Sequence, residues 1–175
     1  MEYFNSPTEF FFLFKNCFLF FYNEIKFYFL GDCKLKNLWK LNGYEITDLL
    51  NKKEVSAIEI CNNLIEHIGK INPKINAIVI ETFEDAKKQA KILDKKIQEG
   101  KRTGLMAGVP ATVKVNTDQI GYPSTNGLRI QKDLVAKKDS PVVKNLRDSD
   151  ALMLGKTNTP AFSIHWFTRN SLHGH

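Results

Sequence analysis

One lysine in this sequence has the setting of a catalytic amine. Lys114 lies near the end of an apolar run, residues 109–115, that is typical of a strand. Burial there would disfavour the ammonium form, and a neutral amine can take a proton from a serine. The same pattern also fits a strand-end lysine in solvent. Spacing alone therefore leaves both roles open.

A second polar segment follows another apolar run. Residues 151–155 read as a buried strand, and residues 156–160 read as the loop after it. The carboxyl ends of parallel strands lie at one edge of a sheet, where α/β proteins place their functional loops. We expect Lys114 and this loop to share that edge.

The other residues suited to chemistry have weaker settings. No G-x-S-x-G segment occurs, so Ser124, Ser163 and Ser171 are expected in caps, in loops or on the surface. His165 is expected to pack with Trp166 and Phe167. The sequence has no phosphate-binding glycine loop and no histidine or cysteine spacing typical of a metal site. We expect neither a metal nor a cofactor.

Helices and strands alternate from about Tyr44 onward. Ser56 and Glu59 form a capping box that opens a helix, which Asn72-Pro73 should end. Further elements are a buried strand at 77–80, a helix at 83–98, a loop at 117–139 and a helix from Pro141. This order predicts an α/β protein with a mostly parallel sheet.

Composition fits one ordinary domain. Of the 175 residues, 43% are apolar and 25% are charged, which excludes wholesale disorder. The net charge of +6 is only mildly basic, and no helix-turn-helix or aromatic–basic pattern accompanies it, so we expect no nucleic-acid partner. Three scattered cysteines fit a reduced, cytoplasmic protein.

Residues 1–42 differ from the rest. Ten of the 13 phenylalanines lie in the first thirty residues. A membrane anchor through residues 10–30, a buried helical extension and translated sequence never selected to fold all remain open. Lys15 and Asn16 interrupt the apolar run and weaken a membrane span. We divide the chain into a Phe-rich leader at 1–42 and a domain at 43–175.

The domain resembles the N-terminal part of the amidase signature family. The motifs that carry the resemblance are residues 105–116, 123–127, 139–143 and 152–162, in the family's order and spacing. Within the family, the pattern is most similar to 6-aminohexanoate-cyclic-dimer hydrolases. Val115 stands where many members have Asp, which weakens a similarity to the amidating chain of tRNA amidotransferases.

The resemblance implies a fold, an activity and a site. It implies the first helices and strands of the amidase fold, and hydrolysis of linear or cyclic amides by a Ser–Ser–Lys triad. Lys114 matches the catalytic lysine by motif position. Thr157, Asn158 and Thr159 are candidates for binding a small amide substrate.

One expected segment is missing. The Gly/Ser-rich segment that supplies both serines in the family follows the position of His175, and no Ser-Ser-Gly-Gly occurs in this sequence. We therefore expect a truncated amidase that is inactive alone. The alternatives are a non-catalytic module that complements a separately encoded C-terminal half, and a membrane-anchored fragment.

Overall fold

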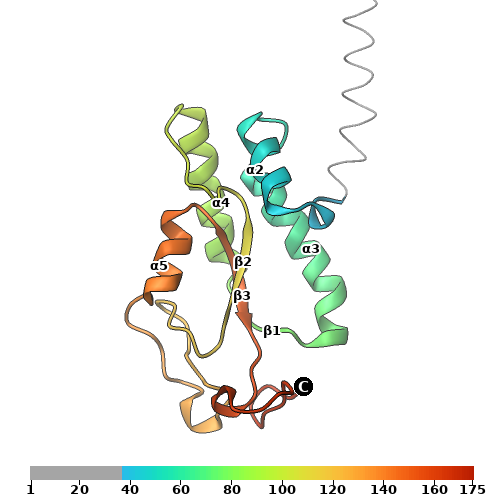
Figure 1. Ribbon diagram of the computed structural model, residues 1–175, viewed down its shortest axis with the longest axis vertical. Helices are drawn as coiled ribbons and strands as arrows, with labels where there is room; N and C mark the ends of the chain where they lie inside the picture. The colour runs from blue at the N-terminus through green and yellow to red at the C-terminus, as the bar shows by residue number, and fades with distance from the viewer. Residues whose placement is uncertain (1–36) are drawn as a thin grey trace, which may run out of the picture. The chain divides into compact units, whose positions relative to one another are not determined.

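The computed structural model describes residues 37–175, which form an α/β unit around a small sheet (Figure 1). This confirms the predicted fold class. The three strands form one mixed sheet in the order β1-β3-β2. In chain order the elements are η1 (Leu38–Lys40), α2 (Gly43–Asn51), α3 (Ala57–Ile75), β1 (Ile78–Glu81), α4 (Phe83–Gln98), β2 (Pro110–Lys114), η2 (Arg129–Gln131), α5 (Pro141–Asp148), β3 (Leu152–Thr157) and η3 (Ala161–Ser163).

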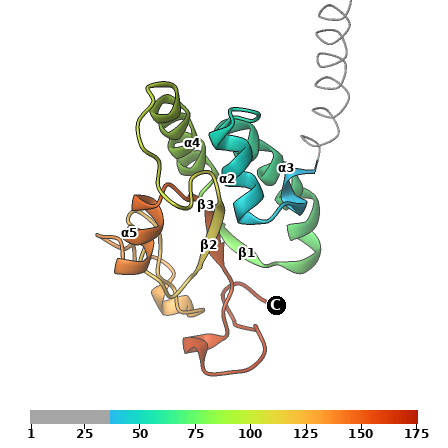
Figure 2. The ribbon, with the colours of Figure 1, turned by 45° about the horizontal axis from the view of Figure 1, so that its top comes forward.

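The central strand, β3, joins the two others. It pairs antiparallel with β1 and parallel with β2. Helix α5 lies on one side of the sheet and α2 and α3 lie on the other (Figures 1 and 2). On the α5 side, Val113 of β2 and Met153 of β3 pack with Val143 of α5 in a buried apolar cluster. The buried cluster fixes α5 against the two parallel strands.

Helix α3 begins where the capping box predicts. The Ser56 hydroxyl accepts from the Glu59 N–H at 3.3 Å, and the Glu59 carboxylate accepts from the Ser56 N–H at 2.8 Å. The Asp94 carboxylate of α4 also accepts from the Ala57 N–H at 2.6 Å and the Ile58 N–H at 3.1 Å. A carboxylate at a helix N-terminus satisfies free donors and complements the helix dipole. The cap therefore also ties α3 to α4.

The predicted end of α3 at Asn72-Pro73 is wrong, because the helix continues to Ile75. Pro73 lies in the last turn, where the N–H it lacks removes only one helical bond. The Asn76 N–H closes that turn on the Asn72 carbonyl at 2.8 Å. The Asn72 side chain also exchanges two 2.8 Å bonds with the Ile78 backbone. Asn72 thus links the end of α3 to β1 instead of stopping the helix.

Two strand predictions need correction. Residues 78–80 are half-buried rather than fully buried, because β1 lies at an edge of the sheet. Strand β3 runs to Thr157, so Lys156 and Thr157 belong to the strand and not to the loop after it. Pairing with both neighbours extends β3 to this point.

The described part of the chain starts with residues that pack on α3. Leu38 is buried, and Trp39 stacks on His67 of α3 with ring centroids 4.0 Å apart. Most of the predicted leader, including residues 10–30, Cys17 and Cys33, lies outside the described residues, and the division at 42/43 stays a prediction. Within residues 37–175, no helix is long and apolar enough to cross a membrane.

Candidate active-site edge

Lys114 and Thr157 lie side by side at one edge of the sheet. They are register partners at the carboxyl ends of the parallel strands β2 and β3. The Val115 N–H donates to the Thr157 carbonyl at 2.9 Å and continues the ladder. The expectation that Lys114 and the segment around Thr157 share one edge is therefore confirmed.

The Lys114 side chain lies on the face opposite α5. Neighbouring residues of a strand point to opposite faces, and Val113 belongs to the cluster under α5. Lys114 and Thr112 therefore share the other face, and both are exposed. Among the described residues, the edge strand β2 has no neighbour beyond it. The Lys114 side chain is thus exposed at this edge of the sheet within the described residues.

The three predicted substrate-binding residues have different surroundings. Thr157 is half-buried beside Lys114, whereas Asn158 and Thr159 are buried. The Asn158 side-chain oxygen accepts from the Asn170 amide at 2.7 Å and from the Thr159 N–H at 2.9 Å. The side-chain oxygen of Asn158 therefore already accepts two hydrogen bonds from within the protein. A substrate role for the three residues stays a prediction.

A polar bridge joins the segments that follow β2 and β3. The Asn116 amide donates to the Ser163 hydroxyl at 3.1 Å, and that hydroxyl lies 2.9 Å from the Thr159 hydroxyl. Phe162 and Ser163 have φ angles of 53° and 60°, in the left-handed region that disfavours non-glycine residues. Side-chain hydrogen bonds hold Ser163 in this conformation. Ser163 is therefore a loop serine, as the sequence predicts, but one with a defined structural contact.

Asn170 organises the last segment and was not identified from the sequence. Its amide donates to the Asn158 side chain and the Thr159 carbonyl, both at 2.7 Å. Its side-chain oxygen accepts from the Leu172 N–H at 2.9 Å and the His173 N–H at 2.6 Å. Nothing in the local pattern distinguishes this asparagine from any other loop residue. Its role depends on contacts that the fold creates.

The buried lysine Lys156 was likewise not identified from the sequence. Its side chain is fully buried, although it ends in an amine. Burial lowers its pKa to about 8, and the Asp118 carboxylate opposes that shift. The amine donates to the Pro123 carbonyl at 2.6 Å and lies 3.5 Å from the Ser124 hydroxyl. The one sequence signal for its burial is its position directly after a buried apolar run. That position fits a solvated lysine equally well.

The expectation that His165, Trp166 and Phe167 pack together in the interior is wrong. All three side chains are exposed, and Trp166 is 99% exposed. They follow the turn at residues 162–163, where both φ angles are positive. Aromatic composition favoured burial, but within residues 37–175 no element covers them.

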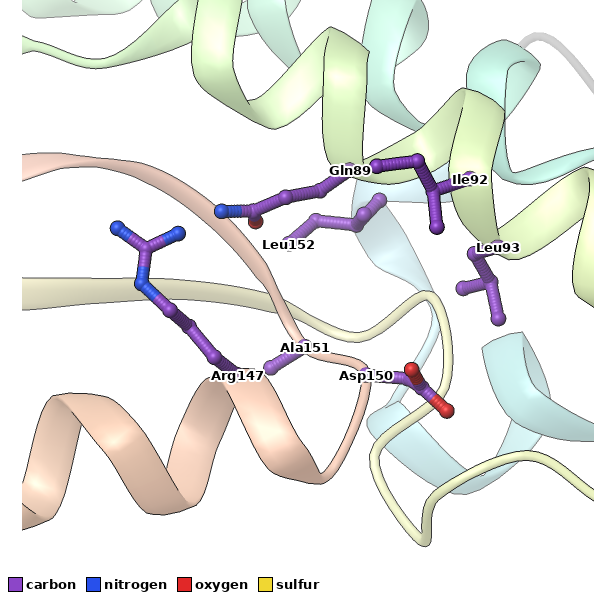
Figure 3. A pocket seen from close by; sticks show the side chains of 7 residues that line it. All are labelled: Gln89, Ile92, Leu93, Arg147, Asp150, Ala151 and Leu152. Atoms are coloured by element: carbon purple, nitrogen blue, oxygen red, sulfur yellow. The ribbon is translucent and has the colours of Figure 1, made fainter.

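A small cavity of about 140 Å³ lies away from Lys114. Asp150, Ala151 and Leu152, at the amino end of β3, line it together with Arg147 and side chains of α4 (Figure 3). Lys114 lies at the carboxyl ends of the strands, so this cavity is not part of the same edge. Within the described residues, no group of three or more His, Cys, Asp or Glu side chains is placed to hold a metal ion.

Known proteins match this chain in both sequence and fold. Indoleacetamide hydrolase of Bradyrhizobium diazoefficiens is 37% identical over 137 residues, which are 78% of this chain and 26% of that protein. The A chain of the glutamyl-tRNA(Gln) amidotransferase of Trichormus variabilis is 38% identical over 127 residues, 73% of this chain and 26% of that protein. The chain thus spans about a quarter of the length of these relatives.

Solved structures agree with this result. A bacterial aryl acylamidase of the amidase signature family matches 77% of this chain and 28% of its own, with a TM-score of 0.74 and 30% identity. Substrate-bound 6-aminohexanoate cyclic dimer hydrolase matches 79% of this chain and 27% of its own, with a TM-score of 0.68 and 28% identity. The fold described here is therefore a part of the amidase fold. Because the Amidase family matches residues 59–175, the segment that carries Lys114 and both parallel strands, this chain belongs to that family.

Proposed function

We propose that this chain supplies the lysine-bearing part of a site that hydrolyses amides. The observation that carries the proposal is the position of Lys114, at the carboxyl end of β2 and beside Thr157, inside the segment that matches the Amidase family. Carboxyl ends of parallel strands are where α/β proteins place reacting groups. The role we assign to Lys114 is that of the general base.

The proposed reaction is acyl transfer through serine. The neutral amine of Lys114 takes a proton from a bridging serine, which takes one from a second serine. The oxygen of the second serine bonds to the amide carbonyl carbon, while backbone N–H groups stabilise the oxyanion. The C–N bond then breaks as the leaving amine takes a proton, and water hydrolyses the acyl-enzyme. We place both serines in a Gly/Ser-rich segment outside these 175 residues.

The exposure of Lys114 sets a condition on this role. A lysine acts as a base where its surroundings remove water from the amine. Lys114 and Thr112 are exposed, and β2 is an edge strand within the described residues. Further polypeptide must therefore cover the Lys114 side chain before the amine can work. We infer that the 175 residues alone do not hydrolyse amides.

In a second candidate function, a separate polypeptide covers the Lys114 side chain. Ile164, Trp166 and Phe167 are 73%, 99% and 85% exposed. Apolar side chains grouped in this way mark interaction surfaces. In the second candidate function, this chain is a non-catalytic module that complements a separately encoded C-terminal half. A membrane-anchored form depends on residues 10–30, which lie outside the described residues.

A chimera tests whether these residues can serve an active amidase. Residues 38–175 replace the region of the Bradyrhizobium indoleacetamide hydrolase that aligns with them. Hydrolysis of indole-3-acetamide and of an acyl anilide is then measured for the chimera and for the 175-residue chain. We expect turnover by the chimera and none by the chain. A chimera that is folded, by its circular dichroism and melting transition, yet inactive would contradict the proposal.

A further inference from the structure

Lys156 is the largest side chain that the described part of the protein buries completely. It is the register partner of Val113, which packs under α5, so Lys156 lies on the α5 face of the sheet. Lys114 lies on the opposite face. The two lysines at this edge therefore have separate surroundings, one buried and one open.

The amine of Lys156 binds the segment that follows β2. It donates to the Pro123 carbonyl at 2.6 Å and lies 3.5 Å from the buried Ser124 hydroxyl. A buried amine without partners would be costly, so its bonds constrain the groups that it meets. Residues 115–140 between β2 and α5 contain only the short helix η2. Connections of this length without regular structure need anchors to hold one conformation.

The anchored segment in turn holds the end of the described chain. The Thr125 hydroxyl lies 3.1 Å from the His173 ring nitrogen Nε2. The Asn126 carbonyl accepts from the Phe162 N–H at 3.0 Å, directly before Ser163. Ser163 is bonded to Asn116, two residues after Lys114. Hydrogen bonds, joined by the backbone at residues 123–126 and 162–163, therefore connect Lys156 to the surroundings of Lys114.

We propose that Lys156 is a positioning residue, a buried tether that fixes residues 117–139 and 160–175 around the edge that carries Lys114. The tether itself is a property of this chain. Its consequence for catalysis rests on the function proposed above. The competing role is that of a core side chain whose loss lowers the stability of the whole unit equally.

Hydrogen exchange of backbone amides separates these roles in the full 175-residue chain. Lys156→Met removes the donor and retains an unbranched side chain of similar length. We expect exchange to accelerate at least about tenfold at Ser124, Leu128 and Phe162, whose N–H groups are hydrogen-bonded in the two tethered segments. Amides inside α3 and α4 should keep their exchange rates.

Met153→Leu is the matched control for this variant. Met153 lies in the same strand and packs in the apolar cluster under α5, so its side chain takes no part in the hydrogen bonds of the tethered segments. We expect no selective acceleration at Ser124, Leu128 or Phe162 in this variant. In Lys156→Met, equal acceleration of amide exchange in the two tethered segments and in α3 and α4 would overturn the tether. So would unchanged exchange at all three amides.

Turnover by the chimera measures the consequence for catalysis. Misplacing a reacting group slightly can cost about 100-fold in rate. We expect Lys156→Met to lower kcat by about 10- to 100-fold while the melting temperature of the chimera, followed by far-ultraviolet circular dichroism, stays close to that of the parent. Unchanged kcat in an active chimera would overturn the catalytic consequence. If the parent chimera is inactive, the exchange result still decides the tether, so the two proposals fail separately.

Discussion

The helical layer, α3 and α4, and the candidate active-site edge are stabilised in different ways. In the helical layer, α3 and α4 bury Ile60, Leu64 and Leu93 and are joined at the cap by Asp94. At the edge, residues 115–139 and 158–175 depend on side-chain hydrogen bonds from Lys156 and Asn170 and expose large apolar groups. Apolar burial stabilises the first region, whereas the second leaves apolar surface suited to further contacts.

The largest expected difference in the free energy of unfolding is between substitution of a core residue and substitution of an exposed aromatic residue. Ile60→Ala removes a fully buried side chain from α3 and should lower the free energy of unfolding by about 2 to 5 kcal/mol. Trp166→Ala removes a side chain that is 99% exposed and should change it by less than about 0.5 kcal/mol. Urea titrations of both variants measure the contrast. Comparable losses would show that the edge is as self-supporting as the helices.

The pH dependence of stability reports on Lys156. Its pKa in the folded protein is about 8 and that of an unfolded lysine is 10.5, so the unfolded chain binds more protons between these values. This group therefore makes stability rise as pH increases from 8 to 10.5, by roughly 2 to 3 kcal/mol in all. Lys156→Met should remove that rise.

Groups whose pKa values are raised act in the opposite direction and require a difference measurement. Burial raises the pKa of Cys61 to about 11 and, with the bond to Asp85, that of Tyr122 to about 12. Both groups make stability fall as pH increases above their unfolded values. Urea titrations of the parent and of Lys156→Met at pH 8, 9 and 10 cancel these contributions. A pH-independent difference would contradict the burial of Lys156.

Asn170→Ala should loosen the edge by an intermediate amount. It leaves the Thr159 carbonyl and the His173 N–H without their side-chain partner, at a cost of about 1 to 3 kcal/mol. We expect this loss mainly as local opening of residues 158–175, seen as faster proteolysis of that segment. Ser171→Ala, at an exposed neighbouring position, is the matched control. Equal cleavage of both variants would contradict the role of Asn170.

The smallest expected effect is at the cap of α3. Ser56→Ala removes the hydroxyl that accepts from the Glu59 N–H and should cost about 1 kcal/mol. The retained contacts from Asp94 to the Ala57 and Ile58 N–H groups limit the loss. Thermal unfolding measures it. A cost above about 2 kcal/mol would mean that Asp94 does not share the capping of this helix.

Three helices were predictable because their sequence signals are local. The signals are the capping box of α3, the apolar face of α4 and the Ser140-Pro141 start of α5. Each lies within a single helix or its cap, and the structure confirms all three. The predicted end of α3 was wrong because the last turn of the helix accommodates Pro73. The predicted end of β3 was wrong because pairing with two strands extends it.

The candidate edge was predictable only in outline. The order of strands placed Lys114 and Thr157 together, and the register confirms it. The burial of Lys156, the bonds of Asn170 and the exposure of Trp166 depend on contacts between segments far apart in the sequence. No local pattern encodes such contacts. The roles of Lys114 and residues 157–159 in catalysis and binding therefore remain proposals.

The most direct test of the central claim is the kcat/KM of Lys114→Ala in the chimera, with indole-3-acetamide as substrate. Lys138→Ala, which removes an exposed lysine from the loop before α5, is the matched control. If Lys114 is the general base, its variant should lose about 10⁴-fold or more in kcat/KM with an unchanged melting temperature, and the control should match the parent. Near-parental turnover by Lys114→Ala would contradict the account.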